Sequence, residues 1–287
     1  MQAKTIIHCH NELGEGPLWH PTQRRLYWLD ILNKKIQCLD PETGNVQEFQ
    51  PDQMITALGL RDEDTFIAAC KEGLGIWNIR SNAFQLLQSP EEGKPNARFN
   101  DGKVDHGGRF WAGTMTTTDA SSTLYRLGAD HQVTPMVNKV TISNGLGWSP
   151  DDRYMYYADT LRHTIYRYDF DVQTGAISDK REFVHLSGQD GVPDGLTVDA
   201  QGAVWVALWG GWRVECYSPE GIQLEQVRLP VAQPSSVAFG GADMDTLYIT
   251  SAREGLSQEA LREQPEAGNL FACQPCVEGL PEPFYAG

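Results

Sequence analysis

Two stretches of the sequence, SNGLGWSPDDRYMYYADT at 143–160 and PDGLTVDAQGAVWVALWG at 193–210, share one pattern. In each, the second residue is polar and is followed by glycine; this polar residue is Asn144 in the first stretch and Asp194 in the second. A short apolar segment, a polar turn and a second apolar segment follow. Aromatic and β-branched residues that alternate with polar ones between such turns are typical of paired β-strands. The two stretches therefore predict two copies of one antiparallel unit.

The glycine of this pattern recurs along the whole chain. The copies are marked by Gly16, Gly59, Gly102, Gly145 and Gly195, and Ser236 takes the place of glycine in the sixth. The markers lie roughly 40–50 residues apart, which is the length of a propeller blade of four strands. Six such units fill the chain from 1 to 287 and leave no room for a second domain. The sequence therefore predicts an all-β fold, a single β-propeller domain with six blades of four antiparallel strands.

Further features of the propeller can be predicted from the same pattern. The first strand of each blade should line the central channel, and the segment at 4–9 should pair into the last blade and close the ring. Helical periodicity is nearly absent, apart from one or two turns at 257–264. A double-sheet sandwich and a β-helix fit less well, because a sandwich has no regular period and the coil of a β-helix is shorter.

The composition argues against several classes of function. The formal net charge is −15 at pH 7 and the 23 Lys and Arg residues are scattered, whereas nucleic-acid binding needs a basic surface. No apolar run approaches the roughly 18 residues of a membrane span, and the N-terminus lacks the features of a signal peptide. We therefore expect a cytoplasmic protein that binds neither nucleic acid nor membranes. Its six cysteines should be free thiols, since the zinc-like spacing of Cys273 and Cys276 has no second pair beside it.

The residues just before the six markers are expected to converge. In a propeller, equivalent positions of successive blades form a ring around the axis, here at the start of the innermost strands. The six residues are Glu15, Leu58, Asp101, Asn144, Asp194 and Ser235. Five of them carry a side-chain oxygen, and an oxygen set without His or Cys favours a hard divalent cation such as Ca²⁺, Mg²⁺ or Mn²⁺. A hydrogen-bonded polar plug is the alternative that this pattern leaves open.

Several stretches resemble the SMP-30/gluconolactonase/LRE family, which includes regucalcin and bacterial sugar lactonases. They are LGEGPLW (13–19), RFNDGKVDHGGRFWAGTM (98–115), ISNGLGWSPDDRYMYYADT (142–160), VPDGLTVDAQGAVWVALWGG (192–211), LYITSAREGLS (247–257) and PEAGNLF (265–271). The resemblance spans almost the whole chain in the order of the family. It implies one divalent metal ion, with calcium, zinc, manganese, magnesium and iron(II) as alternatives, and the hydrolysis of aldonolactones to open sugar acids. The implied substrate is a small sugar lactone of the glucono-, galactono-, arabinono- or xylonolactone type.

The resemblance also implies a role for individual members of the ring. The metal ligands would be Glu15, Asn144 and Asp194. Asp194 is the predicted general base, because a ligating carboxylate has a second oxygen that can accept the proton of a water molecule. Asp101 is expected either to touch metal-bound water or to support the turn.

The substrate contacts are predicted in the same way. Arg98 and Asn100 match the family positions that contact hydroxyl groups of the substrate, and the resemblance also implies that Asn100 lies near the metal. Regucalcin-like members add a substrate-contacting carboxylate shortly after AGTM, and Asp119 is the candidate for it here, within a shorter connection. Two other functions fit the same residues, namely a calcium-binding regulatory protein similar to regucalcin and a hydrolase of other esters or phosphotriesters. The segment RFNDG at 98–102 favours a small polyol substrate over a plain interaction scaffold.

Overall fold

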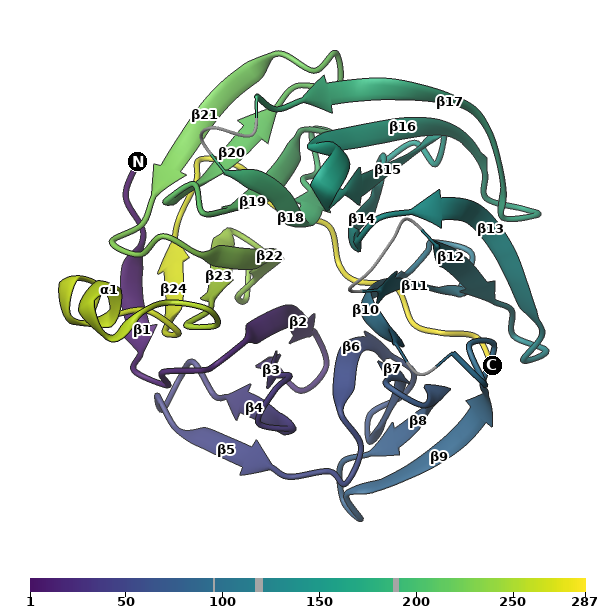
Figure 1. The fold of residues 1–287 in the computed structure, drawn as a ribbon, viewed down its shortest axis with the longest axis horizontal. Coiled ribbons are helices and arrows are strands. Elements are labelled where there is room, and N and C mark those ends of the chain that lie inside the picture. The colour runs from purple at the N-terminus through teal and green to yellow at the C-terminus, as the bar shows by residue number, and fades with distance from the viewer. Residues whose placement is uncertain (95, 117–120, 188–190) are drawn as a thin grey trace.

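The computed structural model shows a ring of six four-stranded antiparallel sheets (Figure 1). The structure describes residues 1–94, 96–116, 121–187 and 191–287, and all six sheets lie within these ranges. The predicted all-β, six-bladed propeller is therefore confirmed.

The first three blades follow one another along the chain. Blade 1 consists of β2 (Gly14–His20), β3 (Arg25–Asp30), β4 (Lys35–Leu39) and β5 (Val46–Phe49). Blade 2 consists of β6 (Ile55–Leu60), β7 (Thr65–Cys70), β8 (Gly73–Asn78) and β9 (Ala83–Gln88). Blade 3 consists of β10 (Ala97–Val104), β11 (Phe110–Thr116), β12 (Ser122–Leu127) and β13 (Val133–Val140).

The last three blades continue the same order until the final sheet. Blade 4 consists of β14 (Ser143–Trp148), β15 (Tyr154–Asp159), β16 (Thr164–Asp171) and β17 (Ala176–His185), with a 3₁₀ turn, η1 (Thr160–Arg162), before β16. Blade 5 consists of β18 (Val192–Val198), β19 (Val204–Trp209), β20 (Arg213–Tyr217) and β21 (Gln223–Arg228). Blade 6 consists of β22 (Pro234–Gly240), β23 (Thr246–Ser251), β24 (Leu270–Cys273) and the N-terminal strand β1 (Lys4–Ile7).

The two ends of the propeller sequence meet in blade 6. Strand β1 pairs antiparallel with β24, with Lys4 opposite Ala272, and forms the outer edge of that sheet. The expected closure of the ring by the N-terminal segment is thus confirmed, over 4–7 rather than 4–9. The short helix expected near 257–264 is α1 (Gln258–Glu263), and the Ser257 side chain caps it by accepting a hydrogen bond from the Ala260 N–H.

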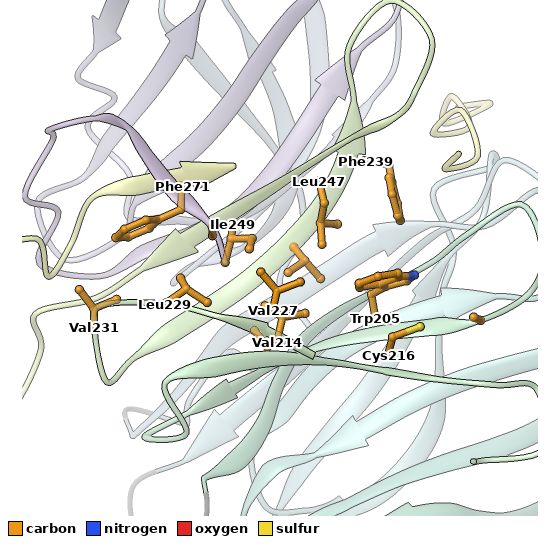
Figure 2. Packing of buried hydrophobic residues seen from close by; sticks show 14 of the residues in the cluster. Trp205, Val214, Cys216, Val227, Leu229, Val231, Phe239, Leu247, Ile249 and Phe271 are labelled. Carbon is orange, nitrogen blue, oxygen red and sulfur yellow. The ribbon is translucent and has the colours of Figure 1, made fainter. Parts of the chain in front are cut away.

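The hydrophobic core lies between neighbouring blades. Between blades 5 and 6, Trp205 and Val214 pack against Phe239 and Ile249 (Figure 2). The rings of Trp205 and Phe239 meet edge to face, with their centroids 6.0 Å apart. Burial of each large apolar side chain contributes roughly 1.5–3 kcal/mol, so these interfaces hold the blades face to face. The inner strands are thereby kept at fixed positions around the axis.

The innermost strand of each blade is its first one, as expected, and the six of them surround the axis (Figure 1). Neighbouring inner strands approach one another closely at Gly145 and Gly195. A Cβ atom on Gly145 would lie 2.6 Å from the backbone oxygen of Asp194, and one on Gly195 would lie 2.1 Å from Ser236 Oγ. At Gly145 and Gly195 the next blade therefore leaves no space for a side chain.

The state of the cysteines agrees with the expectation from the sequence. All six cysteines are free thiols, with Cys273 partly buried and Cys276 exposed. Within the described ranges, no helix has the length and apolar character needed to cross a membrane.

Candidate functional site

Each innermost strand contains a β-bulge near its start. In β2, β10, β14 and β18 two residues oppose one residue of the next strand, and in β6 and β22 one residue has no opposite partner. The first residues of these bulges are Gly16, Thr56, Asn100, Asn144, Asp194 and Ser235. A bulge redirects side chains and is common beside active sites. We call these six residues the bulge ring, and they lie at one end of the channel.

The bulge ring differs from the predicted ring in the first three blades. In blade 2 it contains Thr56, whereas Leu58 pairs with Ala68 and is buried in the apolar core. In blade 3 it contains Asn100, and Asp101 is the second residue of the bulge. The prediction that Leu58 belongs to the ring is therefore wrong. Asn100, which the resemblance places at the substrate and near the metal, is a ring member, although the period alone did not assign it to the ring.

In blade 1 the carboxylate belongs to Glu15, the residue directly before the ring position Gly16. Gly16 has φ of 52°, a left-handed conformation that glycine adopts without strain. Because Gly16 has no side chain, blade 1 places only backbone at its own ring position. Glu15, directly before it, is buried and its Oε2 accepts a hydrogen bond of 3.0 Å from the Gly16 N–H. Glu15 is thus held beside the bulge ring by its own strand.

Two buried oxygens of the bulge ring, Asn144 Oδ1 and Asp194 Oδ1, have no hydrogen-bond partner among the residues that the structure describes. The Asn144 amide donates through Nδ2 to Thr160 Oγ1 at 3.0 Å, and Thr160 in turn donates to the Pro193 carbonyl at 2.9 Å. This chain of hydrogen bonds leaves the oxygen end of the Asn144 amide free. A buried polar atom without a partner costs about 1–3 kcal/mol, and coordination to a cation would remove that cost. The two oxygens therefore fit a hard divalent cation.

The carboxyl groups of the site repel one another. Burial, and then the charges of Glu15 and Asp101, raise the pKa of Asp194 well above its ordinary value. Burial and the charge of Asp101 raise the pKa of Glu15 to about 8, and burial raises the pKa of Asp101 to about 6. Bound metal would compensate the repulsion between the ionised groups.

The candidate ligand set depends on the Asn144 amide. Across 1–94, 96–116, 121–187 and 191–287, no three His, Cys, Asp or Glu side chains lie close enough together to hold a metal ion. Glu15, Asp101 and Asp194 thus do not form a site of three carboxylates. The predicted set of Glu15, Asn144 and Asp194 instead combines two carboxylates with an amide oxygen, which is the donor chemistry of a hard cation.

Arg98 and Asn100 lie together beside the carboxyl groups. Arg98 Nη1 donates to Asn100 Oδ1 and to the Phe99 carbonyl, both at 2.9 Å, and Asn100 Nδ2 donates to the Ser143 carbonyl at 2.8 Å. Burial lowers the pKa of Arg98, while the charges of Glu254 and Glu15 raise it. The predicted substrate contacts therefore form one hydrogen-bonded pair at the site. Asp119, the third predicted contact, lies outside the described residues.

A comparison with known proteins shows the family to which this chain belongs. Residues 13–253 match the profile of the SMP-30/Gluconolactonase/LRE-like region. The chain belongs to this family. Among its SMP-30 family relatives, the 6-deoxy-6-sulfogluconolactonase of Pseudomonas putida is 40% identical over 288 residues, which cover 99% of this chain and 98% of that protein. Regucalcin of Oryctolagus cuniculus is 38% identical over 288 residues, which cover 97% and 96% of the two chains.

A solved structure in the SMP-30 family shares the whole fold. The calcium-binding protein regucalcin from Agrobacterium tumefaciens matches this chain with a TM-score of 0.95 at 28% identity, covering 99% of this chain and 97% of that one. The resemblance predicted from the quoted stretches is thus confirmed.

Two residues of this SMP-30 family site were missed by the sequence analysis. Thr56 is a member of the bulge ring, and the charge of Glu254 acts on both Arg98 and Glu15. Thr56 was missed because the glycine of its blade lies further along the strand than Gly145 does. Glu254 lies in the loop after β23, inside the stretch LYITSAREGLS that resembles the family, but the resemblance assigned it no role.

The raised pKa values predict how the stability of this SMP-30 family protein depends on pH when no metal is bound. A carboxyl with a higher pKa in the folded state binds its proton more tightly when folded, so the folded state loses stability as pH rises above the unfolded value. For Glu15 this window runs from 4.5 to about 8, and for Asp101 it runs from 3.8 to about 6. We therefore expect the melting temperature in the presence of a chelator to fall between about pH 5 and pH 8.

Thermal unfolding followed by circular dichroism would measure this slope. Added Ca²⁺ or Mn²⁺ should remove most of it, because a bound cation stabilises ionised carboxylates. Glu15→Gln should flatten the slope in chelator, since the substitution removes one of the titrating groups. A melting temperature that rises over the same range in chelator would contradict the prediction.

Proposed function

We propose that this SMP-30 family protein is a sugar lactonase that hydrolyses an aldonolactone to the open sugar acid at one divalent metal ion. The observation that carries the proposal is the pair of buried, unpartnered oxygens on Asn144 and Asp194, beside the hydrogen-bonded pair of Arg98 and Asn100. The full-length similarity to a 6-deoxy-6-sulfogluconolactonase supports a lactone as the class of substrate.

Glu15, Asn144 and Asp194 would hold the metal ion. When bound, a divalent ion supplies Lewis acidity toward the lactone carbonyl and lowers the pKa of a bound water molecule. The oxygen-only ligand set favours calcium, magnesium or manganese, and zinc and iron(II) remain alternatives that the family allows.

Asp194 would act as the general base. A carboxylate that binds through one oxygen can accept the proton of the attacking water at its other oxygen. The proton is then needed at the ring oxygen of the lactone, which becomes the hydroxyl group of the open sugar acid.

Arg98 and Asn100 would orient the substrate. The Arg98 guanidinium is planar and always charged, and its N–H groups match the hydroxyl groups of a sugar. Asn100 fixes one side of this guanidinium and is itself fixed to blade 4 through the Ser143 carbonyl. Such a rigid pair lowers the entropic cost of bringing the lactone carbonyl into position.

The proposed partner is a small sugar lactone, and the proposed compartment is the cytoplasm. Free thiols persist in reducing compartments, and all six cysteines of this chain are free. The net charge of −15 disfavours binding to nucleic acid.

Calcium binding without catalysis is the second candidate function. It is favoured by the similarity to the calcium-binding protein regucalcin, which extends over nearly the whole of both chains. A calcium-binding protein would not need the Arg98–Asn100 pair beside its metal site, so this pair favours the lactonase. Hydrolysis of other esters or phosphotriesters at the same ion would use the same residues.

Removal of the metal is expected to abolish lactone hydrolysis. Acid release would be measured in a pH-stat against glucono-, galactono-, arabinono- and xylonolactone, with an aryl ester and a phosphotriester alongside and with spontaneous opening subtracted. Dialysis against a chelator should lower the rate at least about 100-fold, and added Ca²⁺ or Mn²⁺ should restore it.

The pH-stat assay, together with a measurement of calcium binding, separates the candidate functions. Calcium binding without turnover of any lactone would favour the regulatory protein, and turnover of only the aryl ester or the phosphotriester would favour the other hydrolase. Lactone hydrolysis that survives complete removal of the metal would overturn the metal-dependent mechanism.

A further inference from the structure

The C-terminal segment at 279–287 closes the channel at the end opposite the bulge ring. Gly279 bridges to Asp199, just after the end of β18, and Phe284 bridges to Leu60 at the end of β6. The Tyr285 N–H donates to the Leu60 carbonyl at 2.7 Å. In Figure 1 this segment is the yellow loop-like stretch of chain that passes β18, β14 and β10 on its way to the C-terminus. It crosses the far ends of the inner strands and forms a floor beneath the site.

One side chain of this floor pairs with a lysine inside the channel. Glu282 Oε1 lies 2.8 Å from Lys103 Nζ, and the two side chains are only 9% and 20% exposed. Lys103 Nζ also lies 3.4 Å from Thr197 Oγ1 on β18. Lys103 is two residues beyond Asp101 on β10, so the ammonium group lies below the carboxyl groups of the site.

A small cavity connects this ion pair to Asp101. Its volume is about 30 Å³, enough for about two water molecules. Asp101 lines it together with Lys103, Glu282 and Pro283, and most of its remaining wall is apolar. Charges that share such an apolar cavity act on one another more strongly than charges in water. The charge of Lys103 lowers the pKa of Asp101 and the charge of Glu282 raises it, so both charges act on this carboxyl group.

We propose that Lys103 and Glu282 are positioning residues, which set the electrostatic potential beneath the metal centre without touching the metal ion. Lys103 alone would repel a divalent cation, and Glu282 offsets this repulsion from below. The C-terminal segment thereby takes part in metal binding from the far end of the channel. This inference rests on the metal centre of the proposed function.

Calcium and manganese binding to the full-length protein, measured by isothermal titration calorimetry, tests the inference. Glu282→Gln should weaken binding about tenfold, because an uncompensated ammonium group remains under the site. Lys103→Met should bind at least as tightly as the wild type. The double variant Lys103→Met/Glu282→Gln removes both charges, so its affinity should return to within about threefold of the wild type.

A matched control separates charge from folding. Tyr285→Phe removes the hydrogen bond from Tyr285 Oη to the Gly128 carbonyl, which ties down the same segment at 2.7 Å but brings no charge into the cavity. It should lower the melting temperature and leave the metal affinity unchanged.

The outcomes that overturn the inference are distinct from those that overturn the metal centre. Unchanged affinity in Glu282→Gln, or a double variant that binds still more weakly, would show that the ion pair is only structural. A wild-type protein that binds neither ion would overturn the proposed metal centre and this inference together.

Discussion

Replacement of Asp194 with asparagine is expected to lower kcat/KM for the lactone by at least about 1,000-fold and to weaken metal binding strongly. Asparagine has nearly the same shape as aspartate, so the bulge in β18 and its contacts with blade 4 should persist. It lacks the charge that would hold the metal ion and the second oxygen that would accept the proton of water. Steady-state kinetics and calorimetry would measure the two losses.

The same substitution should stabilise the metal-free protein. Asp194 is buried beside Glu15 and Asp101, and their mutual repulsion is part of the reason why its pKa is raised. Removal of one carboxylate relieves that repulsion, so the melting temperature in chelator at about pH 8 should rise by a few degrees. Loss of function combined with a gain in stability is the signature of a residue kept for its chemistry.

Asp199→Asn provides the control. This buried carboxylate accepts hydrogen bonds from Trp205 Nε1 at 2.9 Å and from the N–H groups of Gln201 and Ala203. Its replacement should lower the melting temperature and leave the metal affinity close to that of the wild type. An Asp194→Asn protein with full activity, or with unchanged metal affinity, would remove Asp194 from the metal centre.

The fold could be predicted because its repeat is visible in short, local patterns of the sequence. Each blade is made of short strands between turns that contain Asp, Gly, Pro or Asn, and this pattern does not depend on distant contacts. Closure by the N-terminal strand could also be predicted, because the ring leaves β24 without an outer neighbour unless β1 pairs with it. Strand type and strand number are local properties, and the sequence specifies them well.

The register of the bulge ring could not be read from the same period. The markers Gly16, Gly59, Gly102 and Gly145 are evenly spaced, yet the bulges begin at Gly16 itself, at Thr56 and at Asn100 in the first three blades. Loop lengths differ between blades, so equal spacing does not imply equivalent positions. The ring assignment was right for Asn144, Asp194 and Ser235, where glycine or serine directly follows the first bulge residue.

Contacts between distant segments were also beyond sequence reasoning. Lys103 and Glu282 lie in different parts of the chain, and neither belongs to a motif that suggests the other. They meet because the last residues of the chain cross the channel, which is a property of the closed ring. The charge of Glu254, in the loop after β23, likewise acts on Arg98 in β10, although the two residues are far apart in the sequence.

Gly145→Ala is expected to lower the free energy of unfolding by about 3 kcal/mol or more. The new Cβ would lie 2.6 Å from both the Asp194 oxygen and the Leu196 nitrogen, which are backbone atoms of β18. No rotation of a side chain can relieve these contacts, so β14 and β18 must move apart. Because Asp194 lies on the displaced strand, the metal affinity should fall together with the stability, unlike the opposite changes expected for Asp194→Asn.

Urea denaturation of the metal-free and calcium-loaded proteins would measure this prediction, with Gly128→Ala as the control. The one close contact of a Cβ at Gly128 would be the Asp130 carboxylate oxygen at 2.6 Å, and the Gln132 carbonyl would lie at an ordinary 3.8 Å. The Asp130 side chain can rotate away, so a change below about 1 kcal/mol is expected there. If Gly145→Ala were as stable as the wild type, the inner strands would have to tolerate separation, and the repeated glycine would serve only the turn. A loss of both stability and metal affinity would instead show that the close approach of neighbouring blades holds Asn144 and Asp194 in place.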